Sequence, residues 1–315
     1  MKRYSGLHDK LCTIENIEVA DDNARKNKNK KYGINKHDKN RQYENEDLVD
    51  KLFNLKYKTS KYSLYKIYEP KERIIYRLPY YPDRIAHHAI MNVVKYIWTK
   101  SFIHNTYSCI EGRGIHLCAN NLKRDLRKYP NETKYCLKLD IRKFYPSIPH
   151  NGLKKCIRKK IKDKDFLMIL DEIIDSTDNV RDVSSKLTNK IGIGVPIGLK
   201  VKDNYQIYPV DSRGINFVGY VFYHTHTLIR KSIKYKIIRL VNSYLNREID
   251  KKEFKVRMCA YYGWLKHADA KNLLYKIQSL TGVRYSNWNG KRTNIAKYDW
   301  RIYTKNRKEN IKPQI

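Results

Sequence analysis

One acidic residue is the clearest candidate for chemistry because it lies at the end of an apolar segment. Asp140 lies near the end of residues 135–141, a short stretch that predicts a strand, and the breakers Pro146 and Pro149 follow it. We expect such a strand to be buried, so the carboxylate at its end needs a partner. A divalent cation that holds phosphate would provide one, because hard cations prefer oxygen ligands. The alternative is an aspartate that caps the next turn or pairs with a nearby lysine.

Three arginines that precede Asp140 could bind phosphate. Arg73 and Arg77 lie four residues apart in a predicted strand, so their side chains share a face and suit bidentate phosphate contacts. Gly112 and Gly114 flank Arg113, and two glycines let the backbone come close to a phosphate or a base pair. Exposed strand arginines and an ordinary turn are the alternatives for these two segments.

Four segments, in order along the chain, resemble the motifs of one protein family. They are residues 73–91, residues 108–116, Asp140 with Phe144 and Tyr145, and residues 192–198. The first two are similar to the fingers motifs of reverse transcriptases, the third to their first metal-binding motif, and the fourth to the start of their template-contacting loop. The resemblance is to the enzymes of group II introns, retrons and diversity-generating retroelements, and it covers roughly residues 65–264.

The resemblance implies an α+β fold, a right-hand polymerase with fingers, a truncated palm and a helical thumb. The implied parts are a basic helical extension, fingers, a palm with an internal deletion near residues 198–200, a helical thumb, and a basic, aromatic tail, over residues 1–64, 65–134, 135–225, 226–283 and 284–315. The implied activity is RNA-directed DNA synthesis, in which two Mg²⁺ ions support extension of a DNA primer on an RNA template. Whether an accessory protein takes part stays open.

The resemblance also implies roles for individual residues. Asp140 is the implied catalytic residue, and its carboxylate and the main-chain carbonyl of Ile141 are the implied metal ligands. Tyr145 stands where the family places the aromatic that rejects a 2′-hydroxyl, with an ordinary aromatic at a strand–helix junction as the alternative. The implied substrate-binding residues are Arg73, Arg77, Arg113, Gly114, Tyr145, Pro196 and Gly198. The implied nucleic-acid-binding residues are Phe217, Gly219, Tyr220, Lys231, Tyr262, Lys266 and His267, and for the last three core or rim packing is the equal alternative.

An acidic motif that the family requires is missing from this sequence. In the family, the Pro-Ile-Gly loop leads through a Ser-Gln segment and a helix to a hairpin with Tyr-x-Asp-Asp, whose acids complete the metal site. Here residues 199–205 follow Gly198 at once, and no Asp-Asp pair follows Asp140. Either Asp203 or Asp211 would need a rerouted strand to replace it. We therefore expect a reverse transcriptase by descent that is inactive as it stands; the alternative is a non-catalytic RNA- or DNA-binding remnant.

The charge balance predicts a polyanionic partner. Lysine and arginine number 66 against 32 aspartates and glutamates, which gives a net charge of +34. Such an excess repels itself unless a polyanion neutralises it, and nucleic acid is the natural candidate. Part of the lysine excess could instead be compositional, because Lys, Asn, Tyr and Ile are all abundant. A membrane surface is a weaker alternative, since the lysines are not gathered on one amphipathic helix.

Cysteine spacing and hydropathy favour an intracellular location. The six cysteines form no Cys-x-x-Cys pair and no zinc spacing, so reduced thiols are their simplest interpretation. No stretch approaches the ~18 apolar residues needed to span a bilayer, and residues 1–12 lack the apolar run of a signal peptide. We expect a cytoplasmic protein that has no membrane partner.

Hydrophobic spacing predicts the remaining elements. Helices are expected over residues 7–24, 48–55, 82–98, 115–126, 237–244 and 254–265, and strands over residues 62–68, 206–210 and 215–223. The last two strands are expected to be joined by a turn at residues 211–214. Asn151 is expected to cap a helix that follows it. The basic run of residues 25–41 is either a solvated connector or an arm on a nucleic-acid backbone.

Overall fold

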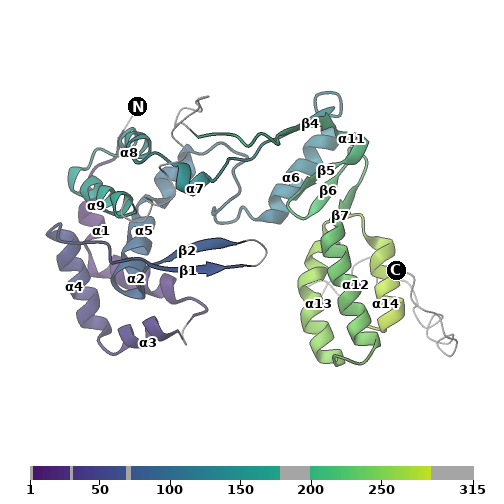
Figure 1. Cartoon of the computed structure of the whole chain (residues 1–315), viewed down its shortest axis with the longest axis horizontal. Coiled ribbons are helices and arrows are strands. Elements are labelled where there is room, and N and C mark those ends of the chain that lie inside the picture. The colour runs from purple at the N-terminus through teal and green to yellow at the C-terminus, as the bar shows by residue number, and fades with distance from the viewer. Residues whose placement is uncertain (1–2, 29–30, 69–71, 178–198, 285–315) are drawn as a thin grey trace. The chain divides into compact units, whose positions relative to one another are not determined.

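The computed structural model describes residues 3–28, 31–68, 72–177 and 199–284. These residues form helices and small antiparallel sheets, so the α+β prediction is confirmed. The chain divides into two compact units (Figure 1). Unit 1 is formed by the described residues of 1–103 and 139–204, and unit 2 by those of 104–138 and 205–315. The expected fingers and palm each contribute residues to both units.

Unit 1 is built around the apolar helix α5. Its helices are, in chain order, α1 (His8–Leu11), α2 (Ile14–Arg25), α3 (Tyr32–Asp38), α4 (Arg41–Phe53), the π-helical turn η1 (Tyr80–Arg84), α5 (Ile85–Ser101), α7 (Phe144–Ser147), α8 (His150–Arg158) and α9 (Lys164–Asp175). Two adjacent stripes of α5, from Ile85 to Ile97, are buried, as their spacing predicts. α1, α2 and η1 pack on α5, and Phe166 of α9 completes this core.

A buried carboxylate ties the N-terminal helices of unit 1 together. Asp21 of α2 is fully buried, and both its oxygens accept hydrogen bonds from the Arg25 guanidinium, at 2.7 and 2.8 Å. Arg41 donates its Nε–H to the same carboxylate at 2.6 Å, and the Tyr80 hydroxyl also donates to it. The first and last residues of the basic run therefore bind a carboxylate of the protein itself.

The hairpin β1 (Ser63–Ile67) and β2 (Arg73–Arg77) also belongs to unit 1. Its strands are antiparallel, with Tyr65 opposite Ile75, and both predicted strands are confirmed. Most side chains of the hairpin are exposed on both faces.

Unit 2 combines small sheets with a bundle of helices. Its elements are α6 (Ile115–Lys128), β3 (Tyr135–Lys138), β4 (Gln206–Pro209), α11 (Val210–Arg213), β5 (Ile215–Phe217), β6 (Tyr220–Phe222), β7 (Thr227–Ile229), α12 (Lys231–Leu245), α13 (Lys251–Lys266) and α14 (Lys271–Thr281). α12 packs against both α13 and α14 around Phe254 and Met258 (Figure 1). A second cluster joins α6 to the sheet β5–β6–β7 through Leu126, Tyr220 and Phe222. The helices expected over residues 115–126, 237–244 and 254–265 are confirmed.

The strand expected over residues 135–141 differs from the prediction in its burial. β3 ends at Lys138 and pairs only with β4, so it belongs to a two-stranded ribbon. Tyr135 and Leu137 are exposed on one face, whereas Tyr208 is buried on the other. The expectation of a buried strand was wrong because a single partner strand leaves the face of Tyr135 and Leu137 uncovered.

Three further expectations are corrected by the fold. The helix expected over residues 7–24 breaks at Cys12, where Thr13 caps α2 by accepting a hydrogen bond from the Asn16 amide. Residues 215–223 form the hairpin β5–β6 rather than one strand, and β4 pairs with β3 instead of with them. α8 begins at His150 after Pro149, so Asn151 lies inside the helix and does not cap it.

Among the described residues, none of the helices combines the length and the hydropathy that a membrane crossing demands.

Candidate functional site

The carboxylate of Asp140 is exposed beside a short antiparallel bridge in unit 1. Ile141 pairs with Val201, and the Lys202 amide donates to the Asp140 carbonyl at 2.8 Å. The Lys202 ammonium forms an ion pair with the Asp140 carboxylate, whose side chain is 68% exposed. The alternative interpretation of Asp140, a pair with a nearby lysine, is therefore the one observed. Lys202 follows soon after the position of the missing motif.

The surroundings of Asp140 do not fit a two-metal centre. A hollow of about 300 Å³ is lined by Leu139, Asp140, Ile141 and Phe144, so Asp140 supplies the one carboxylate among the described residues that line it. No cluster of three or more His, Cys, Asp or Glu side chains suited to a metal ion occurs in the described part of the chain. A second cation would also be repelled by the Lys202 ammonium that already neutralises Asp140.

The aromatic pair after Asp140 lies on the short helix α7. Lys143 precedes this helix in the left-handed region, with φ 43° and ψ 51°. Its carbonyl accepts a hydrogen bond from the Ser147 amide at 3.0 Å, which closes the turn. The rings of Phe144 and Tyr145 meet edge to face with centroids 5.2 Å apart. Tyr145 is 79% exposed, so its ring is accessible, and its role against a sugar stays a prediction.

Arg73 and Arg77 are placed as the sequence predicts. Both belong to β2 and are exposed, and their spacing puts them on the same face of the strand. Ile67 and Ser63 are their cross-strand partners in β1. The hairpin therefore presents two exposed guanidiniums on one face, and a guanidinium suits bidentate phosphate contacts.

Arg113 has a structural role that its glycine neighbours did not indicate. Its guanidinium donates to the carbonyls of His104 and Thr106, at 3.0 and 3.4 Å, and so holds its own loop together. Gly112 adopts a positive φ of 74°, whereas Gly114 has an extended backbone and precedes α6 as its N-cap. A substrate contact by Arg113 would have to replace these carbonyl bonds. Pro196 and Gly198 lie outside the described residues.

The expected contact role of Tyr220 is corrected by its burial. Tyr220 is fully buried in unit 2, and its ring lies against Phe222 and Trp264, with centroids 5.8 and 5.3 Å apart. Its hydroxyl donates to the Trp264 carbonyl at 3.3 Å. A side chain without exposed surface cannot contact a nucleic acid, so Tyr220 serves the core.

Gly219 also has a packing reason for its identity. A Cβ atom at this position would lie 2.2 Å from the Trp264 ring, and the residue has a φ of 89°. In contrast, Phe217 is 44% exposed, and Lys231 is exposed at the start of α12. These two side chains remain available for the predicted contacts.

The predicted thumb residues lie at the end of α13. The rings of His267 and His116 stack with centroids 4.2 Å apart, and Lys266 is exposed beside them in sequence. Burial lowers the pKa of both histidines, and for His267 the charges of His116, Lys266 and Lys123 lower it further. Tyr262 is half-buried. At neutral pH this region therefore carries neutral imidazoles with ammonium groups close by.

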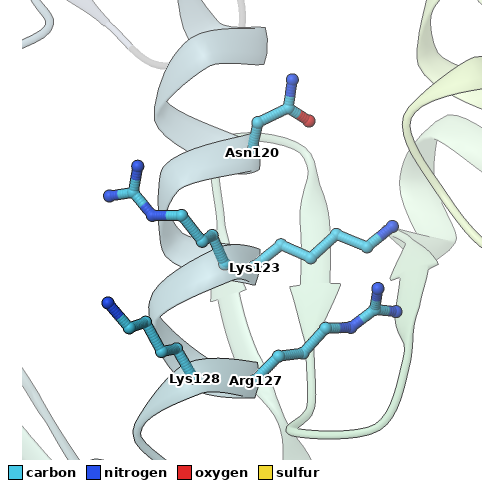
Figure 2. Close-up of a pocket in the computed structure, with 5 residues that line it drawn as sticks. Asn120, Lys123, Arg127 and Lys128 are labelled. Carbon is cyan, nitrogen blue, oxygen red and sulfur yellow. The ribbon is translucent and has the colours of Figure 1, made fainter.

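A basic face on α6 was not predicted from the sequence. Asn120, Lys123, Arg124, Arg127 and Lys128 line a hollow of about 470 Å³ in unit 2. Figure 2 shows Lys123 and Arg127 extending to one side of the helix and Lys128 to the other. The signal that could have found this face is the helical spacing of its members, which are separated by three, four, seven and eight residues from the first.

Comparisons with protein-family models and with curated proteins returned no match for this chain.

Proposed function

We propose that this chain is a reverse transcriptase by descent, with a right-hand architecture, that binds an RNA template and a DNA primer but does not polymerise as it stands. The proposal is supported by four motif-like segments in order and by the net charge of +34. The shared face of Arg73 and Arg77 on β2 agrees with a phosphate-contacting hairpin. The charge and the reduced cysteines favour the cytoplasm as its location.

The proposed lack of polymerase activity rests on one observation, the ion pair between Asp140 and Lys202. Nucleotidyl transfer needs two metal ions roughly 3.5–4 Å apart, which several carboxylates normally hold. Here Asp140 supplies the one carboxylate among the described residues that line the hollow, and the Lys202 ammonium neutralises it. Mg²⁺ at Asp140 would compete with the Lys202 ammonium, and one carboxylate leaves most of the coordination of the ion to water and phosphate. We therefore favour a chain that binds nucleic acid without catalysing nucleotidyl transfer.

Primer extension on an RNA template with Mg²⁺ tests this function. We expect neither the wild type nor an Asp140→Ala variant to make template-dependent products. Both proteins should bind the primer–template duplex equally well in a fluorescence anisotropy titration, because one exposed side chain adds little to the total charge. Products that appear with the wild type and vanish with Asp140→Ala would show an active polymerase. Absence of duplex binding would instead refute the nucleic-acid function itself.

A further inference from the structure

The basic face of α6 is set apart from the side of the helix that serves the core. Cys118, Ala119 and Leu126 of α6 are buried. The opposite side carries the basic residues around the hollow of Figure 2. Arg124 and Arg127 are 60% and 48% exposed. One helix thus packs by one face and presents a row of cations to solvent on the other.

The partners of these cations leave an excess of positive charge. Arg124 pairs with its neighbour Asp125 at 3.0 Å, and Arg127 lies 3.8 Å from Asp269. Lys128 lies over the Tyr129 ring, which carries no charge of its own. Exposed ion pairs contribute little to stability, so a phosphate can replace a carboxylate partner at small cost. Among the described residues, Lys123 makes no ion pair with an acidic side chain.

Stabilisation of the helix end does not account for the whole face. Cations in the last turn of a helix interact favourably with its dipole, and this explains Arg127 and Lys128. The effect falls off within one turn, and Lys123 and Arg124 lie before that turn. Their position instead matches a linear anion. Residues 120–128 span about 12 Å of helix axis, a length over which one strand of a duplex presents roughly three or four phosphates.

We infer that the face formed by Asn120, Lys123, Arg124, Arg127 and Lys128 binds the phosphate backbone of a nucleic acid. The site adds a contact surface to those implied by the motifs, and it does not depend on polymerase activity. The backbone contact is independent of base sequence, because side chains on this face meet phosphate rather than base edges.

A salt titration of a charge-matched pair of variants tests the inference. The test variant is Lys123→Gln/Arg124→Gln/Lys128→Gln, and the control is Lys10→Gln/Lys56→Gln/Lys159→Gln, which removes three exposed lysines from unit 1. Affinities for a duplex and for a single-stranded RNA are measured between 50 and about 300 mM salt. Arg127 is left in place because it also donates to the Thr225 carbonyl.

We expect the test variant to lower the log–log salt slope by about 2.7 for duplex and about 2.1 for the single strand. Affinity near 0.1 M salt should fall roughly 100- to 500-fold if all three side chains contact phosphate. The control should retain the wild-type slope. Equal slopes for the test variant and the wild type, or an equal loss in the control, would overturn the inference and leave the proposed function intact.

Two further measurements complete the test. Thermal unfolding of each variant tests whether a loss of affinity reflects a loss of folding, because Lys123 is half-buried whereas Arg124 and Lys128 are exposed. Vesicles containing phosphatidylserine replace the nucleic acid in a parallel titration. Loss of vesicle binding with unchanged affinity for RNA and duplex would assign the face to a membrane surface and overturn the inference. Failure of the wild type to bind any nucleic acid would overturn both the inference and the proposed function.

Discussion

Val218 and Gly219 form the two-residue turn of the β5–β6 hairpin, and both have positive φ, 39° and 89°. Such turns match the right-handed twist of the flanking strands and favour glycine. At Gly219 a second requirement is added, because the Trp264 ring from α13 lies over the Cα atom. A residue that the family resemblance assigns to nucleic-acid binding is thus also a packing residue of unit 2.

Gly219→Ala should therefore destabilise unit 2 by at least about 2 kcal/mol, because overpacking and a positive φ each cost about 1–3 kcal/mol. Urea unfolding followed by tryptophan fluorescence measures the change. Gly263→Ala is the matched control, since a Cβ there meets no atom within 4 Å inside α13. The control should be neutral or stabilise by up to about 1 kcal/mol. Equal stability of the two variants would contradict the packing role.

At the scale of elements, helices α2, α3 and α4 meet through ionised side chains rather than through apolar contacts alone. His37 of α3 is buried, its Nδ1 lies 2.6 Å from Glu44 of α4, and its Nε2 lies 3.6 Å from Asp21 of α2. Burial acts to lower the pKa of His37, but the charges of Asp21 and Glu44 and the hydrogen bond with Glu44 outweigh it and raise the pKa. The rings of Tyr80 and Tyr81 pack on the imidazole.

This arrangement predicts that the contribution of His37 to the stability of unit 1 is lost as pH rises. A raised pKa in the folded state means that the stabilisation by His37 is fully present below its unfolded pKa, near 6.5, and is lost as pH rises through the folded value. The measured quantity is the free energy of unfolding of the wild type minus that of His37→Gln. This difference should decrease as the pH is raised from 6 to values above the folded-state pKa of His37. Taking this difference removes the opposing contribution of His87 and His88, whose pKa values are lowered by burial. A difference that is constant with pH would contradict the prediction.

The described residues form three clusters of buried side chains, one in unit 1 and two in unit 2, and none of these clusters spans both units. Phe166 belongs to the core of unit 1 and Phe254 to that of unit 2, and both are fully buried. The chain passes between the units three times, after residues 103, 138 and 204. Separate cores favour separate unfolding, because multidomain proteins commonly depart from two-state behaviour.

We expect scanning calorimetry to show two transitions that respond to different substitutions. Phe166→Ala should lower the midpoint temperature of only one transition, and Phe254→Ala that of only the other. Each substitution removes about 3–5 kcal/mol of stability from its own core. Leu228→Ala, at a 42% exposed position of unit 2, serves as a control and should move neither transition appreciably. If both phenylalanine variants shifted one common transition, the two units would unfold together.

Much of the local structure was predictable because it depends on neighbouring residues. The two stripes of α5 and the strand that carries Arg73 and Arg77 follow from spacing alone. The break at Cys12 was missed because apolar residues continue on both sides of it, although Thr13 is a recognisable cap. The turn at Val218 was missed because residues 215–223 form a largely apolar run, which also suits a single strand.

The candidate site was predictable only in part, since its partners are distant in sequence. Asp140 was identified from its neighbours, but the ion pair with Lys202 joins residues 62 positions apart. Likewise, nothing near Arg113 indicated that its guanidinium would bind the carbonyls of its own loop. The burial of Tyr220 depends on Trp264, 44 positions away.

Most of the helices and strands and the large positive charge followed from the sequence, because propensity, period and ionisation are local properties, whereas the α+β class was an expectation from the family resemblance. The pairing of acids with bases, the burial of particular aromatics and the exposure of the basic face of α6 became apparent only in the folded chain. These outcomes depend on which surfaces meet when the chain closes its long loops, and the sequence carries no local signal for that choice.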